Sequence, residues 1–183
     1  KRFKSNNIKE VCILNFASPS YPGNTVRHGR NQESFLCRRS SLIKNLQKDN
    51  EMYKYNADHQ HPYFSNYLIY SPNIVVFRDD NDKLVPHFRV SAISSTPVNY
   101  TEILKNHPNG ERFQNAYKTM KDRCRRIIEL CIKNGNKVLI LGAFGCGSSG
   151  NDPNSISKIF KELLIDEFYG MLLSNIVFAI KSV

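Results

Sequence analysis

One stretch decides the fold of this chain: residues 137–153, which read KVLILGAFGCGSSGNDP. Its early part, Val138 to Leu141, is a run of apolar β-formers and predicts a short buried strand. Residues 155–164 then carry apolar side chains at helical spacing. The glycines in between allow backbone N–H groups to approach an anion at the positive end of that helix. The stretch therefore predicts a phosphate-binding loop, with a tight turn that merely needs small residues as the alternative.

The residue order in this loop fits neither of the two common nucleotide-binding motifs. It lacks the Lys-Ser/Thr pair of a P-loop, and it lacks a G-x-G-x-x-G pattern with an acidic residue about 20 positions later. A second small-residue loop, residues 18–29, follows another apolar run, residues 11–17. Ligands of open α/β sheets bind beyond the carboxyl ends of strands, where both loops would lie. The pair of loops therefore favours one shared ligand that carries phosphate.

Strand-like and helix-like segments alternate along the rest of the chain. Alternation of this kind predicts an α/β domain with layers of helices on a mixed, mostly parallel central sheet. Residues 49–67 are polar and aromatic and resist assignment. Strands are expected at residues 11–17, 73–78, 88–93, 137–141 and 175–180, and helices at 32–48, 111–134 and 155–168.

Composition narrows the class of protein and its partners. We expect residues 1–183 to form a single domain, because this length suffices for one core. The net charge of +10 favours a polyanion, although a lysine-rich solvated surface explains it as well; the one dense basic run is Arg123, Arg125 and Arg126. Five widely spaced cysteines argue against a disulfide scaffold or zinc site and favour a reducing compartment. No apolar run approaches the length of a membrane span.

A series of ordered blocks resembles the microbial-type poly(ADP-ribose) glycohydrolases, which are macrodomain proteins. The resemblance runs from about Val11 to Ile180 and includes both glycine-containing loops. Several blocks in order are far more specific than any one loop. The blocks are residues 13–18 with Pro22-Gly23, residues 32–42, Tyr70-Ser71-Pro72, residues 76–80, Arg89-Val90-Ser91, residues 141–153 and residues 177–180.

The resemblance implies a three-layer α/β/α macrodomain-like sandwich that binds ADP-ribose in a cleft, without a cofactor or a metal. The N-terminal portion of the family, with an early strand and adenine-side contacts, is expected to be missing. Expected partners are ADP-ribose or an ADP-ribosylated protein or polymer. We expect a monomer in the cytoplasm or nucleus, with no membrane partner and with direct nucleic-acid binding ranked low. The residues expected to contact ligand are Asn15, Ala17, Gly23, Asn24, Thr25, Gln32, Ser34, Gly145, Cys146, Gly147, Ser148, Ser149, Gly150, Asn151 and Phe178.

The catalytic signature of the family is altered in this chain. The family carries three glycines and then Gln-Glu-Glu, whereas this sequence reads Gly23-Asn24-Thr25 and then Gln32-Glu33-Ser34. In the family the second glutamate is the general acid that protonates the departing ribose oxygen, and a serine hydroxyl cannot replace it. Glu33 is therefore the tentative catalytic residue, either as it stands or after a local shift of one residue.

Two functions follow from these expectations. The first is hydrolysis of an ADP-ribosyl linkage by a diverged site, with an attachment such as arginine-linked ADP-ribose as one possible substrate. The alternative is a catalytically inactive module that reads ADP-ribose without cleaving it. Other candidate residues have a plainer reading: Glu33 as a first-turn helix glutamate, Cys146 as a small residue in a tight loop, Phe144 and Phe178 as core, and His28, His59 and His61 as surface histidines.

Overall fold

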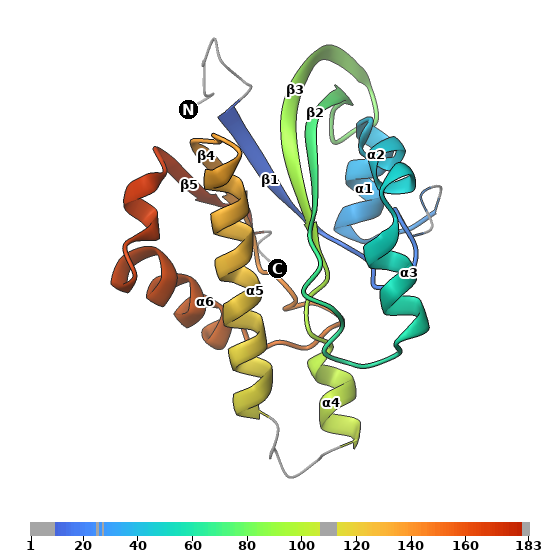
Figure 1. The fold of residues 1–183 in the computed structure, drawn as a ribbon. Coiled ribbons are helices and arrows are strands. Elements are labelled where there is room, and N and C mark those ends of the chain that lie inside the picture. The colour runs from blue at the N-terminus through green and yellow to red at the C-terminus, as the bar shows by residue number, and fades with distance from the viewer. Residues whose placement is uncertain (1–9, 25, 27, 107–112, 181–183) are drawn as a thin grey trace.

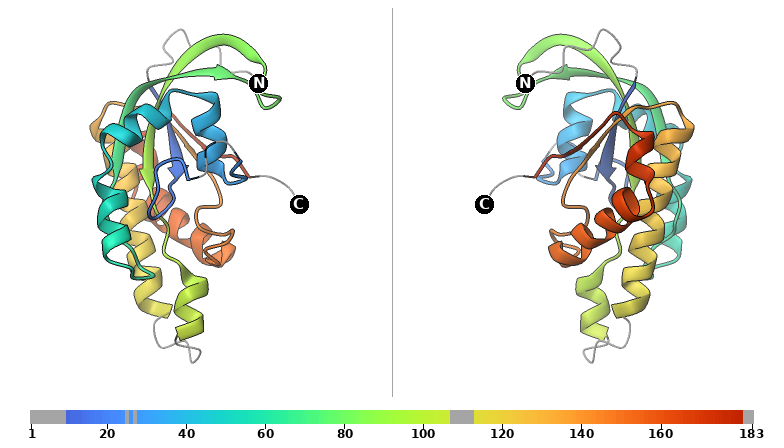
Figure 2. Two further views of the ribbon diagram at one scale, coloured as in Figure 1. Left: turned by 90° about the vertical axis from the view of Figure 1, so that its right-hand side faces the viewer. Right: turned by 90° about the vertical axis from the view of Figure 1, so that its left-hand side faces the viewer.

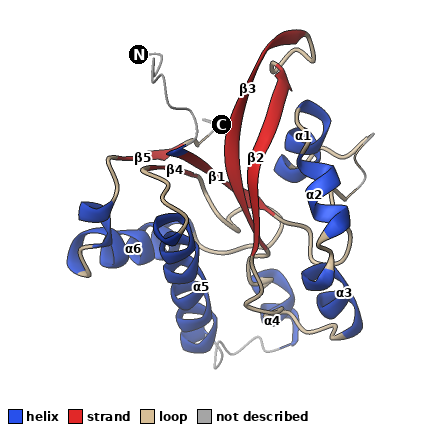
Figure 3. Cartoon of the chain, turned by 45° about the horizontal axis from the view of Figure 1, so that its top comes forward, coloured by secondary structure: helices blue, strands red, loops and turns tan. Residues whose placement is uncertain are grey.

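The protein is a three-layer α/β/α sandwich (Figure 1). A computed structural model describes residues 10–24, 26, 28–106 and 113–180. Within these residues, a five-stranded sheet has helices packed on both faces (Figure 3). No helix in the described ranges has the length and apolar character to cross a membrane. The predicted fold class is confirmed.

The central sheet is mixed and mostly parallel. Its strands are β1 (Val11–Phe16), β2 (Ile69–Arg78), β3 (Leu84–Ser95), β4 (Val138–Leu141) and β5 (Asn175–Phe178). They lie in the order β2-β3-β1-β4-β5, and only β2 and β3 pair antiparallel. Because β1, β3 and β4 run the same way, their carboxyl ends meet at one edge of the sheet.

Each face of the sheet buries its own apolar core. On one face lie α1 (Gln32–Arg39), α2 (Leu42–Lys48) and α3 (Glu51–Asp58). On the other lie α5 (Phe113–Lys133) and α6 (Pro153–Lys161), while α4 (Tyr100–Asn106) sits near the carboxyl ends of the strands. Leu42, Leu46 and Met52 anchor the first core, and Ile127, Ile128 and Phe160 are among the anchors of the second. Burial of these side chains is the main stabilising contribution.

The single helix predicted for residues 32–48 is wrong, because the chain breaks at Ser40 and Ser41. Ser40 is extended, with φ −145° and ψ 174°, and forms an isolated β-bridge with Val76. The Ser41 hydroxyl accepts from the Val75 N–H at 2.9 Å, and the Ser41 N–H donates to the Val75 carbonyl at 2.9 Å. Serine side chains compete with helical hydrogen bonds in this way. The break ties the helical layer to strand β2.

The unassigned residues 49–67 contain α3, and strands β2 and β3 are longer than predicted. Strand β2 continues through Ser71-Pro72-Asn73, where the register with β3 shifts and Asn73 has φ +53°. A proline and a bulge hide such a strand from sequence patterns. At their far end β2 and β3 form a ribbon that bends beyond the rest of the sheet (Figure 2).

The long helix and the segments that follow it largely match expectation. Helix α5 ends at Lys133, and Gly135 follows in the turn, where its φ of +73° suits the left-handed end of a helix. The segment expected to form one helix over residues 155–168 begins earlier, with Asp152 as N-cap and Pro153 in the first turn. It then passes into a π-helix, Glu162–Asp166, and a 3₁₀-helix, Tyr169–Leu172. The turn after β4 therefore leads directly into α6.

Candidate functional site

A cleft of about 620 Å³ lies where β1, β3 and β4 end. The loop after each of these three strands contributes to its walls. This is the edge of an α/β sheet at which ligands bind. The described residues that line it are Phe16, Ala17, Ser18, Pro19, Asn24, Arg30, Asn31, Gln32, Phe64, Thr96, Pro97, Asn99, Ala143, Gly145, Gly147, Ser148 and Ser149.

The glycine-rich loop after β4 is held from behind by Asn151. The Asn151 amide donates to the carbonyls of Val98 at 2.8 Å and Gly145 at 3.1 Å. Gly145 has φ +77°, and a Cβ there would lie 2.6 Å from the Asn151 amide nitrogen and 2.8 Å from Cβ of Pro97. Only glycine therefore fits at residue 145, and Asn151 shapes the loop from a buried position outside the cleft lining.

The front of the same loop is open toward the cleft. A Cβ on Gly147 would meet nothing within 4 Å. The carbonyl of Ser149 accepts from the N–H groups of Tyr100 and Thr101, and the carbonyl of Ser148 accepts from the Thr101 hydroxyl, so both serines are anchored to α4. Within the described residues, the N–H groups of Gly147, Ser148 and Ser149 make no hydrogen bond. Successive free N–H groups of this kind form a concave anion site.

Gln32 fixes the opposite wall of the cleft. Its side chain accepts from the Phe16 N–H at 2.7 Å and donates to the Leu14 carbonyl at 2.8 Å, both on β1. Asn31 caps α1 by accepting from the Ser34 N–H at 2.8 Å. Together these bonds set the position of the first turn of α1 against the sheet. Asn24, with φ +48°, also lines this part of the cleft.

Glu33 lies behind this wall and is fully buried. One carboxylate oxygen accepts from the Tyr53 hydroxyl at 2.6 Å and from the Asn15 amide at 3.1 Å. The other accepts from the Ser18 N–H at 3.0 Å. Burial raises the pKa of the Glu33 carboxyl above its usual range, although these hydrogen bonds offset part of the effect. The neighbouring Tyr53 pKa is raised as well, first by burial and then by the Glu33 charge.

Asn15 leaves one acceptor unused beside Glu33. Its amide donates to Glu33 and to the Ser94 hydroxyl at 2.9 Å, and the side chain is fully buried. Its carbonyl oxygen, Oδ1, has no hydrogen-bond partner among the described residues. A buried acceptor without a partner is costly unless a ligand or water satisfies it.

Ser34, which the sequence resemblance aligns with the second glutamate of the family, does not line the cleft. The residue is fully buried, and its hydroxyl donates to the Gly23 carbonyl at 3.0 Å. Gly23 has φ +70°, and a Cβ there would lie 2.6 Å from Cγ2 of Val26 and 2.7 Å from Cδ1 of Ile43. Gly23 and Ser34 thus pack the turn before α1. Thr25, which was expected to contact ligand, lies outside the described residues.

A second, mostly apolar pocket of about 350 Å³ adjoins the glycine-rich loop. Ala143 lines both this pocket and the cleft, so the two hollows meet at the loop. Cys146 and Phe178 line the pocket, and Phe178 packs edge-on against Phe160 at 5.2 Å between ring centroids. Burial raises the pKa of the Cys146 thiol, which disfavours the reactive thiolate. Phe144 is fully buried and belongs to the core.

The structure gathers part of the predicted set at the cleft. Nine expected ligand residues line either hollow directly, whereas Asn15, Gly23, Ser34, Gly150 and Asn151 line neither. Cleft residues outside the predicted set include Arg30, Phe64, Thr96, Pro97 and Asn99. Thr96 to Asn99 follow a predicted strand and could have been found from that position. The cleft-lining members of the predicted set are Ala17, Asn24, Gln32, Gly145, Gly147, Ser148 and Ser149, and those at the apolar pocket are Cys146 and Phe178.

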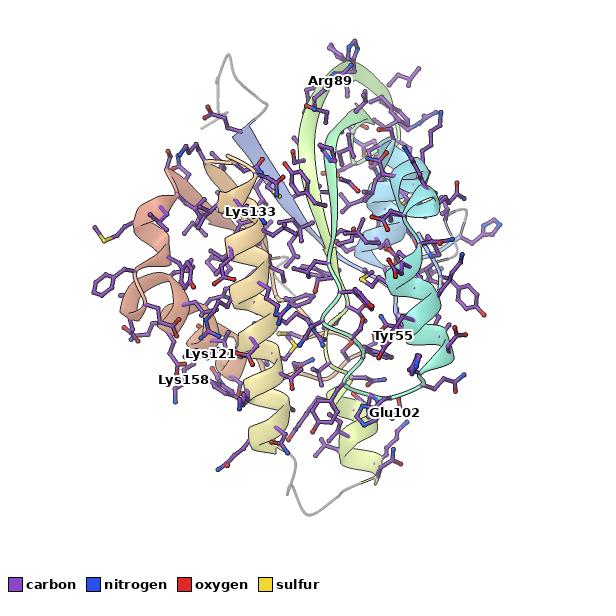
Figure 4. All side chains as sticks on the ribbon, in the orientation of Figure 1. Tyr55, Arg89, Glu102, Lys121, Lys133 and Lys158 are labelled. Carbon is purple, nitrogen blue, oxygen red and sulfur yellow. The ribbon has the colours of Figure 1, made fainter. Side chains whose placement is uncertain are left out.

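The basic run Arg123, Arg125 and Arg126 on α5 does not form one cationic patch. Of the basic run on α5, Arg123 is fully buried and Arg125 pairs with Asp122 and Glu167. Figure 4 shows Lys121 and Lys158 on the α5 and α6 side of the molecule and Arg89 far away on the β2–β3 ribbon. The run therefore does not form the polyanion surface that its sequence suggested. In the described ranges, no three His, Cys, Asp or Glu side chains are placed to hold a metal ion.

The fold and the cleft define the class as an α/β/α macrodomain-like, ligand-binding domain. A family model for the catalytic domain of microbial-type poly(ADP-ribose) glycohydrolase matches residues 1–79. The glycohydrolase of Deinococcus radiodurans, solved with ADP-ribose, is 31% identical with a TM-score of 0.86; the match covers 93% of this chain and 68% of that one. The glycohydrolase of Thermomonospora curvata with the inhibitor ADP-HPD is 32% identical with a TM-score of 0.87, over 93% and 64% of the two chains.

These matches confirm the resemblance seen in the sequence, and the chain belongs to the poly(ADP-ribose) glycohydrolase family. A search of curated protein sequences gave no match.

Proposed function

We propose that this protein binds ADP-ribose in the cleft and hydrolyses an ADP-ribosyl linkage there. The observation that carries the proposal is the set of N–H groups at Gly147, Ser148 and Ser149, three cleft-lining residues whose N–H groups make no hydrogen bond within the described part of the chain. A diphosphate is the part of ADP-ribose that such groups bind, and the overall positive charge favours it further. The same ligand occurs in the Deinococcus radiodurans structure.

The two hollows suit the two ends of the ligand. The apolar pocket beside Phe178 would take the adenine, because a flat base buries well against aromatic and aliphatic side chains. The cleft wall at Gln32 would take the distal ribose.

Glu33 is the residue that we assign to proton transfer. Because burial raises its pKa, a larger share of Glu33 is protonated at a given pH than for an exposed glutamate. The acid would protonate the oxygen that leaves C1 of the distal ribose, the C1–O bond would break, and water would add to the sugar cation after losing a proton to the carboxylate. For this, Glu33 must exchange one of its present hydrogen bonds for one to the substrate.

Binding without cleavage is the second candidate function. It is favoured by the complete burial of Glu33, both of whose oxygens already accept from protein donors. It is favoured equally by Ser34, which has no group that can act as an acid near neutral pH. The two candidates share the cleft and differ only in what happens at its ribose end.

One set of assays separates the candidates. ADP-ribose binding is measured by calorimetry, and release of ADP-ribose is measured from poly(ADP-ribose) and from arginine-linked ADP-ribose. Hydrolysis by the wild type that disappears in Glu33→Gln supports the enzyme. Binding without release by the wild type, with release gained in Ser34→Glu, supports the binding module. No binding at millimolar ADP-ribose would refute both.

We also propose the setting in which this site works. Five unpaired cysteines, four of them buried, fit a reducing compartment such as the cytoplasm or nucleus. The partner would be an ADP-ribosylated protein or polymer, bound by one copy of a single macrodomain. Sedimentation at micromolar concentration tests the monomer, and cell fractionation tests the location.

A further inference from the structure

Arg123 is a buried cation with no carboxylate partner among the described residues. Its side chain is fully buried on α5, and among the described residues it forms no salt bridge. Burial lowers the pKa of its guanidinium to about 10. A charge in such a place is costly unless every donor finds an acceptor. The residues that supply those acceptors therefore indicate what Arg123 holds.

The acceptors all come from two segments that end at the cleft. Arg123 donates to the Asn66 side-chain oxygen at 3.1 and 3.0 Å and to the Tyr63 carbonyl at 2.8 Å. It also donates to the Thr96 carbonyl at 2.5 Å. Tyr63 and Asn66 flank Phe64 in sequence, and both Phe64 and Thr96 line the cleft. One side chain thus clamps two wall segments to the same helix.

The clamped turn is held in an unfavourable backbone conformation. Phe64 has φ +54°, in the left-handed region that bulky residues avoid. Further bonds fix the turn on both sides: the Asn99 N–H donates to the Pro62 carbonyl at 2.7 Å, and the Ser65 N–H donates to the Asn56 side chain at 2.8 Å. A conformation of this kind persists only where the surroundings enforce it, and it is common at ligand sites.

We propose that Arg123 is a positioning residue for ligand binding, which holds the 63–66 turn so that Phe64 contacts the bound ADP-ribose. This inference rests on the proposed function and adds a specificity-determining aromatic side chain to it. The ring of Phe64 supplies an apolar surface for a sugar or base, whereas the loop at Gly147 supplies polar N–H groups. Arg123 itself does not touch the ligand.

A double-mutant cycle tests the proposal in the full chain. ADP-ribose affinity is measured by calorimetry for the wild type, Arg123→Met, Phe64→Ala and the double variant. We expect each single change to weaken binding about tenfold, and the double variant to be no weaker than Phe64→Ala alone, because coupled residues are not additive. Arg125→Met is the matched control, since Arg125 lies on the same helix and pairs with Glu167 on the protein surface. Its affinity should equal that of the wild type.

Two further variants guard against loss of folding. Asn66→Ala removes an exposed acceptor of Arg123 and should weaken binding severalfold while the protein stays folded. Phe64→Gly relieves the left-handed backbone and should melt about 3 °C above Phe64→Ala while binding equally weakly.

The failures are distinguishable. A wild type that does not bind ADP-ribose refutes the proposed function and this inference with it. This inference alone is refuted if the wild type binds ADP-ribose and the affinity is unchanged both in Asn66→Ala and in whichever of Arg123→Met and Phe64→Ala remains folded. Additive losses in the cycle would show that Arg123 acts on the fold in general and not through Phe64.

Discussion

Gly145 and Gly147 lie two residues apart in one loop, and replacing each by alanine should affect a different property. Gly145→Ala should lower the stability of the fold, whereas Gly147→Ala should lower the affinity for ADP-ribose. At Gly145 the new Cβ would lie 2.6 Å from the Asn151 amide nitrogen and 2.8 Å from Cβ of Pro97, at φ +77°. The left-handed conformation costs an alanine about 1–2 kcal/mol. Displacing Asn151 also breaks its bonds to Val98 and Gly145, at about 1 kcal/mol each.

Gly145→Ala should therefore lose about 3 kcal/mol of stability, which lowers Tm by about 10 °C in a domain of this size. Gly147→Ala meets nothing within 4 Å and has no left-handed φ, so its stability should change by less than about 0.5 kcal/mol. Its methyl group, however, enters the cleft beside the free N–H groups. We expect about a tenfold loss of ADP-ribose affinity, and Gly147→Glu should abolish binding, because a carboxylate repels the diphosphate.

Thermal unfolding followed by circular dichroism measures the first effect, and calorimetric titration with ADP-ribose measures the second. Equal Tm values for Gly145→Ala and Gly147→Ala would refute the packing argument. Unchanged affinity in both Gly147→Ala and Gly147→Glu would refute the assignment of the loop to the diphosphate.

Three further predictions concern Glu33, Cys146 and Phe178. Because burial raises the pKa of Glu33, the contribution of Glu33 to stability is complete below its unfolded pKa and is lost as the pH rises through its folded pKa. The Tm of the wild type should therefore fall from about pH 4 upward, and Glu33→Gln should flatten this fall. Parallel curves of Tm against pH for the two proteins would contradict the prediction. Cys146→Ser should keep ADP-ribose release, if present, within about twofold, since the thiol pKa is raised; loss of release would show a nucleophile. Phe178→Ala should weaken ADP-ribose about tenfold but leave ribose 5-phosphate unaffected in a competition assay, and equal losses would move the adenine elsewhere.

The fold was largely predictable because its main elements carry strong local patterns. The apolar runs of β1 and β4 and the periodic α5 all appear where expected. The errors fall where a side chain or a distant strand overrides the pattern. Ser40 and Ser41 split one helix because their partners lie on β2, about 35 residues away in sequence.

The lining of the cleft was predictable only where one segment carries the whole pattern. The glycines of residues 145–149 predicted a ligand loop, and the structure places this loop at the cleft. Phe64 could not be expected there, because its turn is held by Arg123, 59 residues later, and the sequence around that arginine predicts a basic surface run. Burial of a charge is a property of the folded chain, which local charge patterning does not reveal.

The two hydrogen bonds that join the Gln32 side chain to Phe16 and Leu14 fix the register of α1 against β1. Sliding α1 by one residue would break both bonds and also remove the Asn31 cap, so Glu33 cannot move into the position of Ser34. Glu33 must act from where it stands, or not at all. A shift of α1 therefore cannot bring a second carboxylate to the position of Ser34, and only a substitution at that residue can.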